Sequence, residues 1–286
     1  MAREGSRRGE GCHELGVKVL TRMSADGRTS SLNPKGSQLD IQKTARLFGW
    51  FFIGTFVTSL AAKALFVSGV GGSFSELRFV PGAVSETSVY LGAILEFLLI
   101  VANIATAVVI YPLVKRQSEK VALGYVTARI MESAFILVGL VSILSIVSVS
   151  NALTGATGAE ATALAVQGNS LAATYDWAFL FGPGLVVGFG NGLMLGYLMY
   201  RSGLVPRRMA MLGLIGGPML IASFVLILFG VYENGPGPAG LMALPEIAWE
   251  ASLGIYAAWK GFKPSPITSD QPRHVGIEPA LSPAGA

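Results

Sequence analysis

The chain has 286 residues, of which 52% are hydrophobic and only 13% charged, with a formal net charge of +4. A soluble domain holds about a quarter charged residues, so this composition excludes an ordinary soluble protein and indicates lipid as the solvent. The basic residues are scattered over several short segments rather than gathered in one patch, which argues against a nucleic-acid-binding protein.

Six apolar stretches are long enough, at about 20 residues per crossing, to span the hydrocarbon core of a bilayer. They predict an all-α polytopic membrane protein, a bundle of six transmembrane helices. In chain order the predicted spans are 45–66, 88–113, 121–147, 175–200, 209–232 and 242–259. Residues 148–174, between the third and fourth spans, are predicted to form an outer loop with one short surface helix.

Two tails flank this membrane domain, which is predicted to cover residues 43–263. The N-terminal tail, residues 1–42, is basic and rich in Gly and Ser, and the C-terminal tail, 264–286, is rich in Pro. The N-terminal tail has no apolar run next to its basic region, so it does not resemble a signal peptide and is predicted to be disordered. The proline content of the C-terminal tail predicts disorder there too.

The basic residues predict the orientation of the spans. All but three of the 21 Lys and Arg residues lie before residue 47, in the links at 115–120 and 201–208, or after residue 259. By the positive-inside rule both termini are predicted to face the cytoplasm. The exceptions are Arg78 on the outer side and Lys63 and Arg129 inside spans. Lys63 is near the outer end of its span and is expected to reach water by extending its side chain.

The fourth span carries glycines at every fourth position, Gly184, Gly188, Gly192 and Gly196. This spacing places them in one stripe of bare backbone, which lets helices approach closely in lipid. Pro183 removes a backbone donor and is expected to kink the same helix near its outer end. Close packing is the main interpretation of the stripe, and a hinge is the alternative.

Several polar side chains are predicted to lie deep in the membrane, and on each helix they keep to one face. A charge at this depth costs roughly 2.5–3.5 kcal/mol on insertion scales, so these faces are expected to turn away from lipid and converge. The predicted cluster contains Glu96, Asn103, Arg129, Glu132, Asn191, Glu246 and Glu250.

The charges of this cluster do not balance, because four glutamates face a single arginine. Arg129 is predicted to pair with Glu132 and with one carboxylate from another helix, either Glu96 or Glu250. The remaining carboxylates repel one another in a poorly solvated site, so at least one is expected to be protonated near neutral pH.

Two functional hypotheses follow from the cluster. The leading one is translocation or sensing of a proton, cation or small solute, because intramembrane carboxylates often mark such paths. The alternative is a structural or regulatory membrane protein whose polar cluster only fixes helix packing. Besides lipid, the predicted partner is therefore a proton or small solute.

An intramembrane enzyme is the weakest alternative. The single cysteine, Cys12, and both histidines, His13 and His274, lie in the tails. No predicted membrane helix therefore carries a thiol or an imidazole, which argues against a zinc site or a histidine-activated nucleophile. The sequence predicts no enzyme activity, no metal and no cofactor.

Some of these stretches resemble one known family. They are ARIMES at 128–133, Glu96 with Tyr111 at the inner end of its span, GYLMYRSGLVPRRMAMLGLIGG at 196–217, and Glu250 followed by KGF at 260–262. On these motifs, residues 43–263 resemble the bacterial multi-pass membrane family catalogued as domain of unknown function 4386. The resemblance implies a protein of the bacterial cytoplasmic membrane and adds weight to the buried charges, but it implies no activity.

Overall fold

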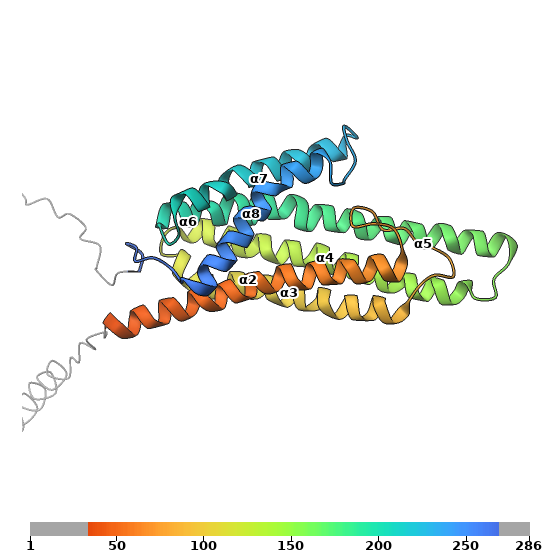
Figure 1. Ribbon diagram of the computed structural model, residues 1–286, viewed down its shortest axis with the longest axis horizontal. Helices are drawn as coiled ribbons and strands as arrows, with labels where there is room; N and C mark the ends of the chain where they lie inside the picture. Colours follow the sequence, from red (N-terminus) through yellow and green to blue (C-terminus); the bar gives the residue numbers. More distant parts are fainter. Residues whose placement is uncertain (1–33, 269–286) are drawn as a thin grey trace, which may run out of the picture. The chain divides into compact units, whose positions relative to one another are not determined.

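The computed structural model describes residues 34–268, with side chains from Asp40 onward. By its internal contacts the chain divides after Leu39, and the helical unit runs from Asp40. The described residues are helical apart from turns, links and one isolated bridge between Gly72 and Leu77. The elements are α2 (Pro34–Val70), α3 (Glu86–Val114), α4 (Glu119–Leu153), α5 (Gly158–Phe179), the π-helical segments η1 (Leu180–Val186) and η2 (Gly188–Leu195), α6 (Gly196–Ser202), α7 (Arg207–Leu228) and α8 (Pro238–Trp259) (Figure 1).

Within the described part of the chain, five helices are long and apolar enough to cross a membrane, namely Asp40–Val70, Glu86–Val114, Glu119–Leu153, Gly158–Ser202 and Arg207–Leu228. Large apolar side chains lie on their outer surfaces, where Val57 is 62% exposed and Phe97 is 55% exposed. So much exposed apolar surface is unfavourable in water and is the normal surface of a helix in lipid. The fold therefore indicates a membrane protein with several crossings.

The sixth predicted span lies in α8, a helix of 22 residues that is not among these five. Glu246, Glu250 and Pro245 lower its hydropathy below that of the other helices. α8 packs against α7 along the chain and against α2 at its C-terminal end. There Gly49 leaves no room for a Cβ beside the backbone of Gly254 and Ala258.

The predicted outer loop at 148–174 is wrong. α4 continues to Leu153 and α5 begins at Gly158, so only a short turn separates the two helices. α5 then runs without a break through η1 and η2 into α6, which makes one helix of 45 residues ending at Ser202.

Helix propensity and packing together explain why this segment is helical. It is rich in alanine, the strongest helix former, which outweighs its weak polarity. It also buries one face against neighbouring chain: Gly168 lies against the ring of Phe79, and Ser142 Oγ on α4 donates a 2.6 Å hydrogen bond to Leu171 O. A sequence that looked like a loop therefore forms a helical hairpin with α4.

Short sequence signals set the ends of the other helices. Ser85 and Ser118 accept hydrogen bonds from the amides at the starts of α3 and α4 and serve as their N-caps. Gly203 ends α6 with a φ of 71°, a left-handed conformation that glycine adopts without strain. Pro206 comes directly before α7, where its missing N–H costs no helical hydrogen bond.

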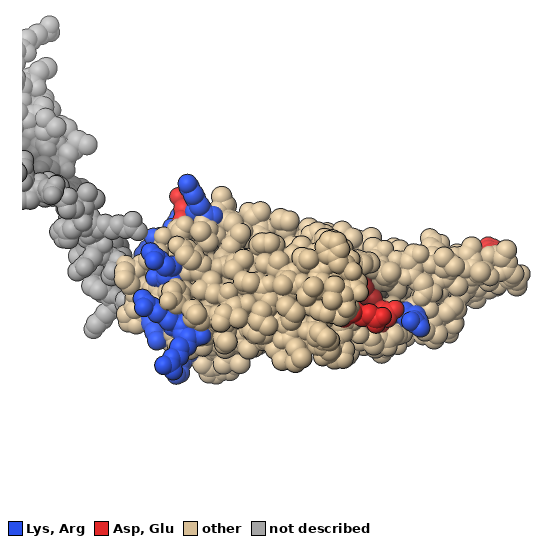
Figure 2. All heavy atoms as spheres, turned by 90° about the horizontal axis from the view of Figure 1, so that it is seen from above, with Lys and Arg blue, Asp and Glu red and all other residues tan. Residues whose placement is uncertain are grey.

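Lys and Arg side chains gather at one end of the helical unit, called here the basic end (Figure 2). The links after α3 and α6, together with the C-terminal end of α8, carry these residues. The chain after α8 also packs there, since Lys263 N donates to Leu204 O at 2.9 Å and Ile267 is buried. Residues 264–268, part of the predicted C-terminal tail, are thus ordered against the bundle, and α2 already begins at Pro34. The rest of the two predicted tails, 1–33 and 269–286, lies outside the described residues.

Two apolar cores hold the helices together. One core contains Phe48, Tyr125 and Trp249 and lies toward the basic end, and the other contains Phe66 and Ile143. Along α3 and α4 the polar residues of the predicted cluster fall between the two cores. The polar site is therefore enclosed by apolar packing on both sides.

Candidate functional site

Arg129 on α4 lies at the centre of a closed polar network. Its Nη1 donates to Oε2 of Glu132, one turn along the same helix, at 2.7 Å. Asn103 on α3 donates from Nδ2 to Glu132 Oε1 at 3.0 Å and accepts a hydrogen bond from Arg129 Nη2 at its Oδ1. Because each charged group has a partner of suitable chemistry, the network offsets the cost of burying it.

Glu96 lies elsewhere, although it shares a face of α3 with Asn103. The two residues are seven positions apart, about 10 Å along the helix axis. Glu96 Oε1 accepts a 2.9 Å hydrogen bond from the Tyr175 hydroxyl on α5, and its Oε2 has no hydrogen-bond partner in the described part of the chain. Beyond Glu132, Arg129 donates its hydrogen bonds to Asn103 and not to Glu96. Glu250, the other predicted partner, lies within electrostatic reach of Arg129 without a direct ion pair.

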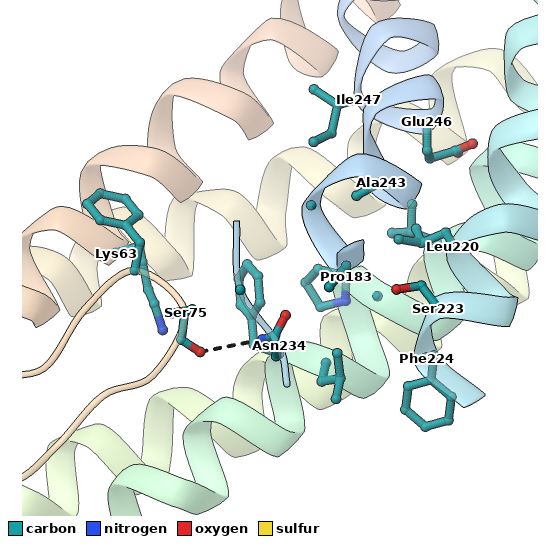
Figure 3. A pocket seen from close by; sticks show the side chains of 18 of the residues that line it. Lys63, Ser75, Pro183, Leu220, Ser223, Phe224, Asn234, Ala243, Glu246 and Ile247 are labelled. Atoms are coloured by element: carbon teal, nitrogen blue, oxygen red, sulfur yellow. Dashed lines mark hydrogen bonds between the residues drawn. The ribbon is translucent and has the colours of Figure 1, made fainter. Parts of the chain in front are cut away.

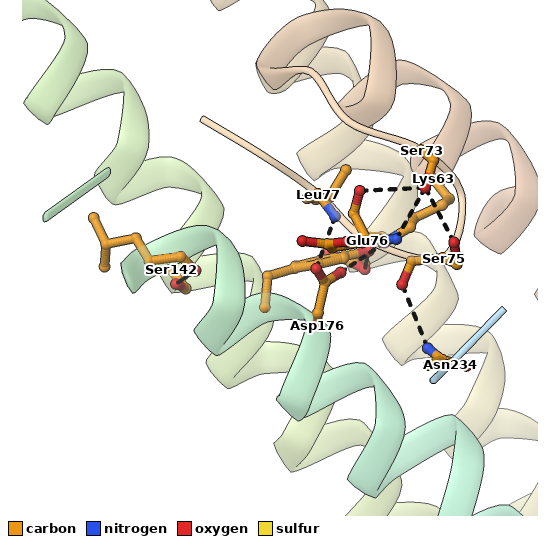
Figure 4. A network of polar contacts seen from close by, with 11 residues as sticks. Lys63, Ser73, Ser75, Glu76, Leu77, Ser142, Asp176 and Asn234 are labelled. Carbon is orange, nitrogen blue, oxygen red and sulfur yellow. Dashed lines mark hydrogen bonds and ion pairs between the residues drawn. The ribbon is translucent and has the colours of Figure 1, made fainter. Parts of the chain in front are cut away.

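Lys63 on α2 is buried, and the expectation that it reaches water is wrong. Only 6% of it is exposed, and its Nζ lies 3.1 Å from Oδ1 of Asp176 on α5. The same ammonium lies 4.6 Å from the centre of the Tyr175 ring. The other oxygen of Asp176, Oδ2, accepts a 2.7 Å hydrogen bond from Leu77 N, which ties the α2–α3 link to this ion pair (Figure 4). This ion pair makes it unnecessary for Lys63 to leave the bundle.

Asp176 is the functional candidate that the sequence interpretation missed. It stands next to Tyr175 at the start of a predicted span, a position typical of a residue at the membrane surface. The available signal was depth, because Lys63 and Asp176 lie near the outer ends of their spans with opposite charges. Sequence spacing does not say which spans are neighbours, so the pair could not be assigned.

The carboxylates of α8 form the third group. Glu250 Oε1 accepts a hydrogen bond from Asn191 Nδ2 on η2, and the Asn191 carbonyl accepts a 2.9 Å bond from the indole N–H of Trp249. Glu246 lies one turn away on the same face and is 2% exposed. Neither of its oxygens has a hydrogen-bond partner within residues 40–268. An unpaired polar group in such a position is costly and calls for an explanation.

The four stripe glycines have different neighbours. A Cβ at Gly188 would lie 2.8 Å from the carbonyl oxygen of Gly217 on α7, and one at Gly192 would overlap the Gly217 backbone. Gly196 is also tight, at 3.3 Å from the α7 backbone. Gly184 meets only ordinary contacts and lines a cavity instead. Close packing against α7 is therefore the role of three glycines, and the fourth leaves open space.

Glycine also makes room for Glu246. A Cβ added at Gly192 or at Gly216 on α7 would lie 2.8 Å from Glu246 Oε2. The carboxylate thus sits where two helices present bare backbone to α8. The sequence pattern of glycines predicted close helices, and the structure adds that an acidic side chain occupies part of the space they leave.

A cavity of about 700 Å³ adjoins these groups, between α2, η1, α7 and α8. It is partly open, and the links at the end opposite the basic end border it through Ser75 and Asn234. Figure 3 shows Lys63 on its α2 side and Glu246 on its α8 side. Glu250 also lines it, whereas Arg129, Glu132 and Glu96 do not. The cavity therefore reaches the α8 carboxylates and the Lys63–Asp176 pair, but not the Arg129 network.

Carboxyl groups outnumber basic groups among the residues that line the cavity. Among the described residues of the helical core, Arg129 and Lys63 each form an ion pair with one carboxylate, Glu132 and Asp176 respectively. The remaining carboxylates, Glu96, Glu246 and Glu250, form no ion pair there, and two of the three line the cavity.

A comparison with models of known protein families identifies the family of this chain. The model described as domain of unknown function (DUF4386) matches residues 47–261. The chain belongs to the DUF4386 family. The match covers every residue of the candidate site, so the Arg129 network and the cavity lie within the DUF4386 region. Searches of curated proteins and of solved structures found no match.

Proposed function

We propose that α8 is a sixth crossing and that both ends of the unit face the cytoplasm. With 22 residues α8 is about 33 Å long, enough to cross the hydrocarbon core. Its glutamates lie inside, whereas Leu244 and Ile255 are more than half exposed on the outer side. The Lys and Arg side chains at the basic end support the cytoplasmic assignment. A cysteine placed at Asn169 should react with an impermeant reagent outside intact cells, and reaction of Ser265→Cys there would contradict this topology.

We propose that this membrane protein translocates or senses a proton, cation or small solute at the cavity. The observation that carries the proposal is the contact of a partly open cavity with Glu246 and Glu250, two carboxyl groups that form no ion pair with any other residue the structure describes. Carboxylates in such a place are costly, and they are retained where a cation or proton visits them. The pair Lys63–Asp176 on the other wall adds a second polar contact along the same space.

A structural role is the second candidate, and one observation favours it for part of the cluster. Arg129, Glu132 and Asn103 satisfy one another and do not reach the cavity. Such a closed network fixes the register of α3 against α4 without needing a ligand. We assign packing to this network and solute contact to the α8 carboxylates. No enzyme activity is proposed for either group.

The test is cation flux through the purified protein in liposomes. With a potassium gradient and valinomycin imposing a membrane potential, entry of protons is followed with a trapped pH dye. Wild-type protein is expected to raise the flux above that of protein-free liposomes, and Glu250→Gln is expected to lower it by about tenfold or more because its negative charge is gone. Glu86→Gln removes an exposed carboxylate at the start of α3 and is the matched control.

The same assay is repeated with other monovalent cations, each followed with a trapped dye that reports its concentration. Flux equal to that of protein-free liposomes for all of them would contradict translocation. Equal flux for the wild type, Glu250→Gln and Glu86→Gln would show that the cavity carboxylate has no part in it.

A further inference from the structure

The cavity walls are mainly apolar and aromatic, which narrows the class of solute. Phe56 on α2, Phe179 at the end of α5 and Phe224 on α7 all line it, together with leucine and proline side chains. A bare inorganic ion gains nothing from such walls after losing its water. A molecule with an apolar body gains the burial of that body, as in most small-molecule sites.

Glu250 presents the polar contact that such a molecule would use. Its Oε1 is held by Asn191, while Oε2 accepts no hydrogen bond from the described residues. The side chain is half-buried and lines the cavity, so the second oxygen is available to a ligand. Glu246, one turn away, is nine-tenths and more buried, has no hydrogen-bond partner among the described residues and places a second carboxyl group beside the same space.

The two glutamates of the cavity favour a cation as the ligand, and the other side chains that line the cavity indicate which kind of cation. The only basic side chain among the described residues that line the cavity is Lys63, which is already paired with Asp176, so an anion finds no free cationic partner there, whereas neither of these carboxyl groups forms an ion pair with a described residue. Within the described residues there is no group of three His, Cys, Asp or Glu side chains placed to hold a metal ion. Aromatic faces attract organic ammonium groups, which are the cations best matched to a cavity that combines carboxylates with phenylalanine rings.

We propose that the cavity binds a small amphipathic organic monocation. Its charged group lies at Glu250 Oε2 with Glu246 close by, and its apolar body lies against Phe56, Phe179 and Phe224. The inference rests on the proposed function, because it takes the same cavity as the solute site, and it adds the chemical class of the solute.

Binding of radiolabelled tetraphenylphosphonium to the full-length protein in dodecyl maltoside tests this inference. Equilibrium dialysis measures binding, and protein-free micelles give the background. Tetraphenylarsonium, of the same charge and shape, is expected to compete, and neutral triphenylphosphine oxide is not. Glu250→Gln is expected to weaken binding by about tenfold or more, because the attraction between the carboxylate and the phosphonium charge is lost. Glu86→Gln is expected to bind like the wild type.

A second variant fills the cavity and leaves both carboxylates in place. Ala243 lines the cavity on α8, and Ala243→Phe is expected to abolish saturable binding without removing any charge. Thermal unfolding of each variant in the same detergent verifies that it is folded. If Ala243→Phe fails this check it is replaced by the milder Ala243→Leu, and if Glu250→Gln fails it is replaced by Glu250→Ala, which also removes the carboxylate; the same direction of effect is expected.

The outcomes separate the two proposals. Equal binding by Glu250→Gln and wild type, equal competition by the neutral analogue, or no saturable binding by folded wild-type protein would overturn the organic-cation assignment. If proton flux still depends on Glu250 in that case, the proposed function stands without the organic-cation assignment. Saturable, Glu250-dependent binding with no flux of any cation would support the ligand class and contradict translocation.

Discussion

Replacing Arg129 by methionine is expected to lower the free energy of unfolding by about 3–5 kcal/mol, the usual cost of stranding one member of a buried pair. Glu132 and Asn103 would keep their positions on α4 and α3 but lose the cation that both contact. Glu132 must then take up a proton or the two helices must separate. Reversible unfolding in detergent measures the loss, with Glu86→Gln as the surface control.

A double-mutant cycle locates the coupling. Arg129→Met combined with Glu132→Gln should cost less than the two single changes together, because neither charge is then left alone. Arg129→Met combined with Glu96→Gln should be additive, since Glu96 bonds to Tyr175 instead. Additivity in the Glu132 cycle would show that the pair is not a unit.

The second large effect is expected at Gly192. Gly192→Ala places a methyl group into the Gly217 backbone and 2.8 Å from Glu246 Oε2, so α7 and α8 must move away. Overpacking of this kind costs about 1–3 kcal/mol. Gly184→Ala is the matched control on the same helix, because its Cβ would lie 3.5 Å from Leu180 and meet nothing closer. The melting temperatures of the two variants in detergent give the comparison.

Gly192→Ala should melt clearly below the wild type, and Gly184→Ala should melt close to it. Equal melting of both variants would contradict the close approach of η2 to α7. A larger drop in melting temperature for Gly184→Ala than for Gly192→Ala would show that the tight helix contact is at Gly184, not at Gly192.

The helices could be predicted from the sequence because hydropathy and length alone define an apolar helix. The same rule fails at 148–174, where weak polarity suggested a loop but alanine content and packing against α4 produced a helix. Hydropathy measures the preference for lipid, not the preference for helix, so a helix that extends past the apolar segment carries no hydropathy signal.

The sequence predicts which residues belong to the polar site better than it predicts which of them pair with one another. Arg129 and Glu132 are three apart on one helix, so their pairing follows from helical geometry. The separation of Glu96 from that pair, and the pairing of Lys63 with Asp176, depend on which helices are neighbours and how they are rotated. A single sequence shows which face of each helix is polar, but not which helices are neighbours. The cavity depends on both the neighbours and the rotation of each helix, so it could not be predicted.

The measurement that most directly tests a water-accessible, negatively charged cavity uses one cysteine on its wall. In a background with Cys12→Ser, Ala243→Cys is treated in liposomes with methanethiosulfonate reagents that carry either an ammonium or a sulfonate group. Leu244→Cys, on the outer side of α8, is the control. The cationic reagent is expected to modify Ala243→Cys about tenfold faster than the anionic one, and Glu250→Gln is expected to remove most of that difference. Equal rates for the two reagents, or no reaction at this position in folded protein, would contradict the cavity as a cation site.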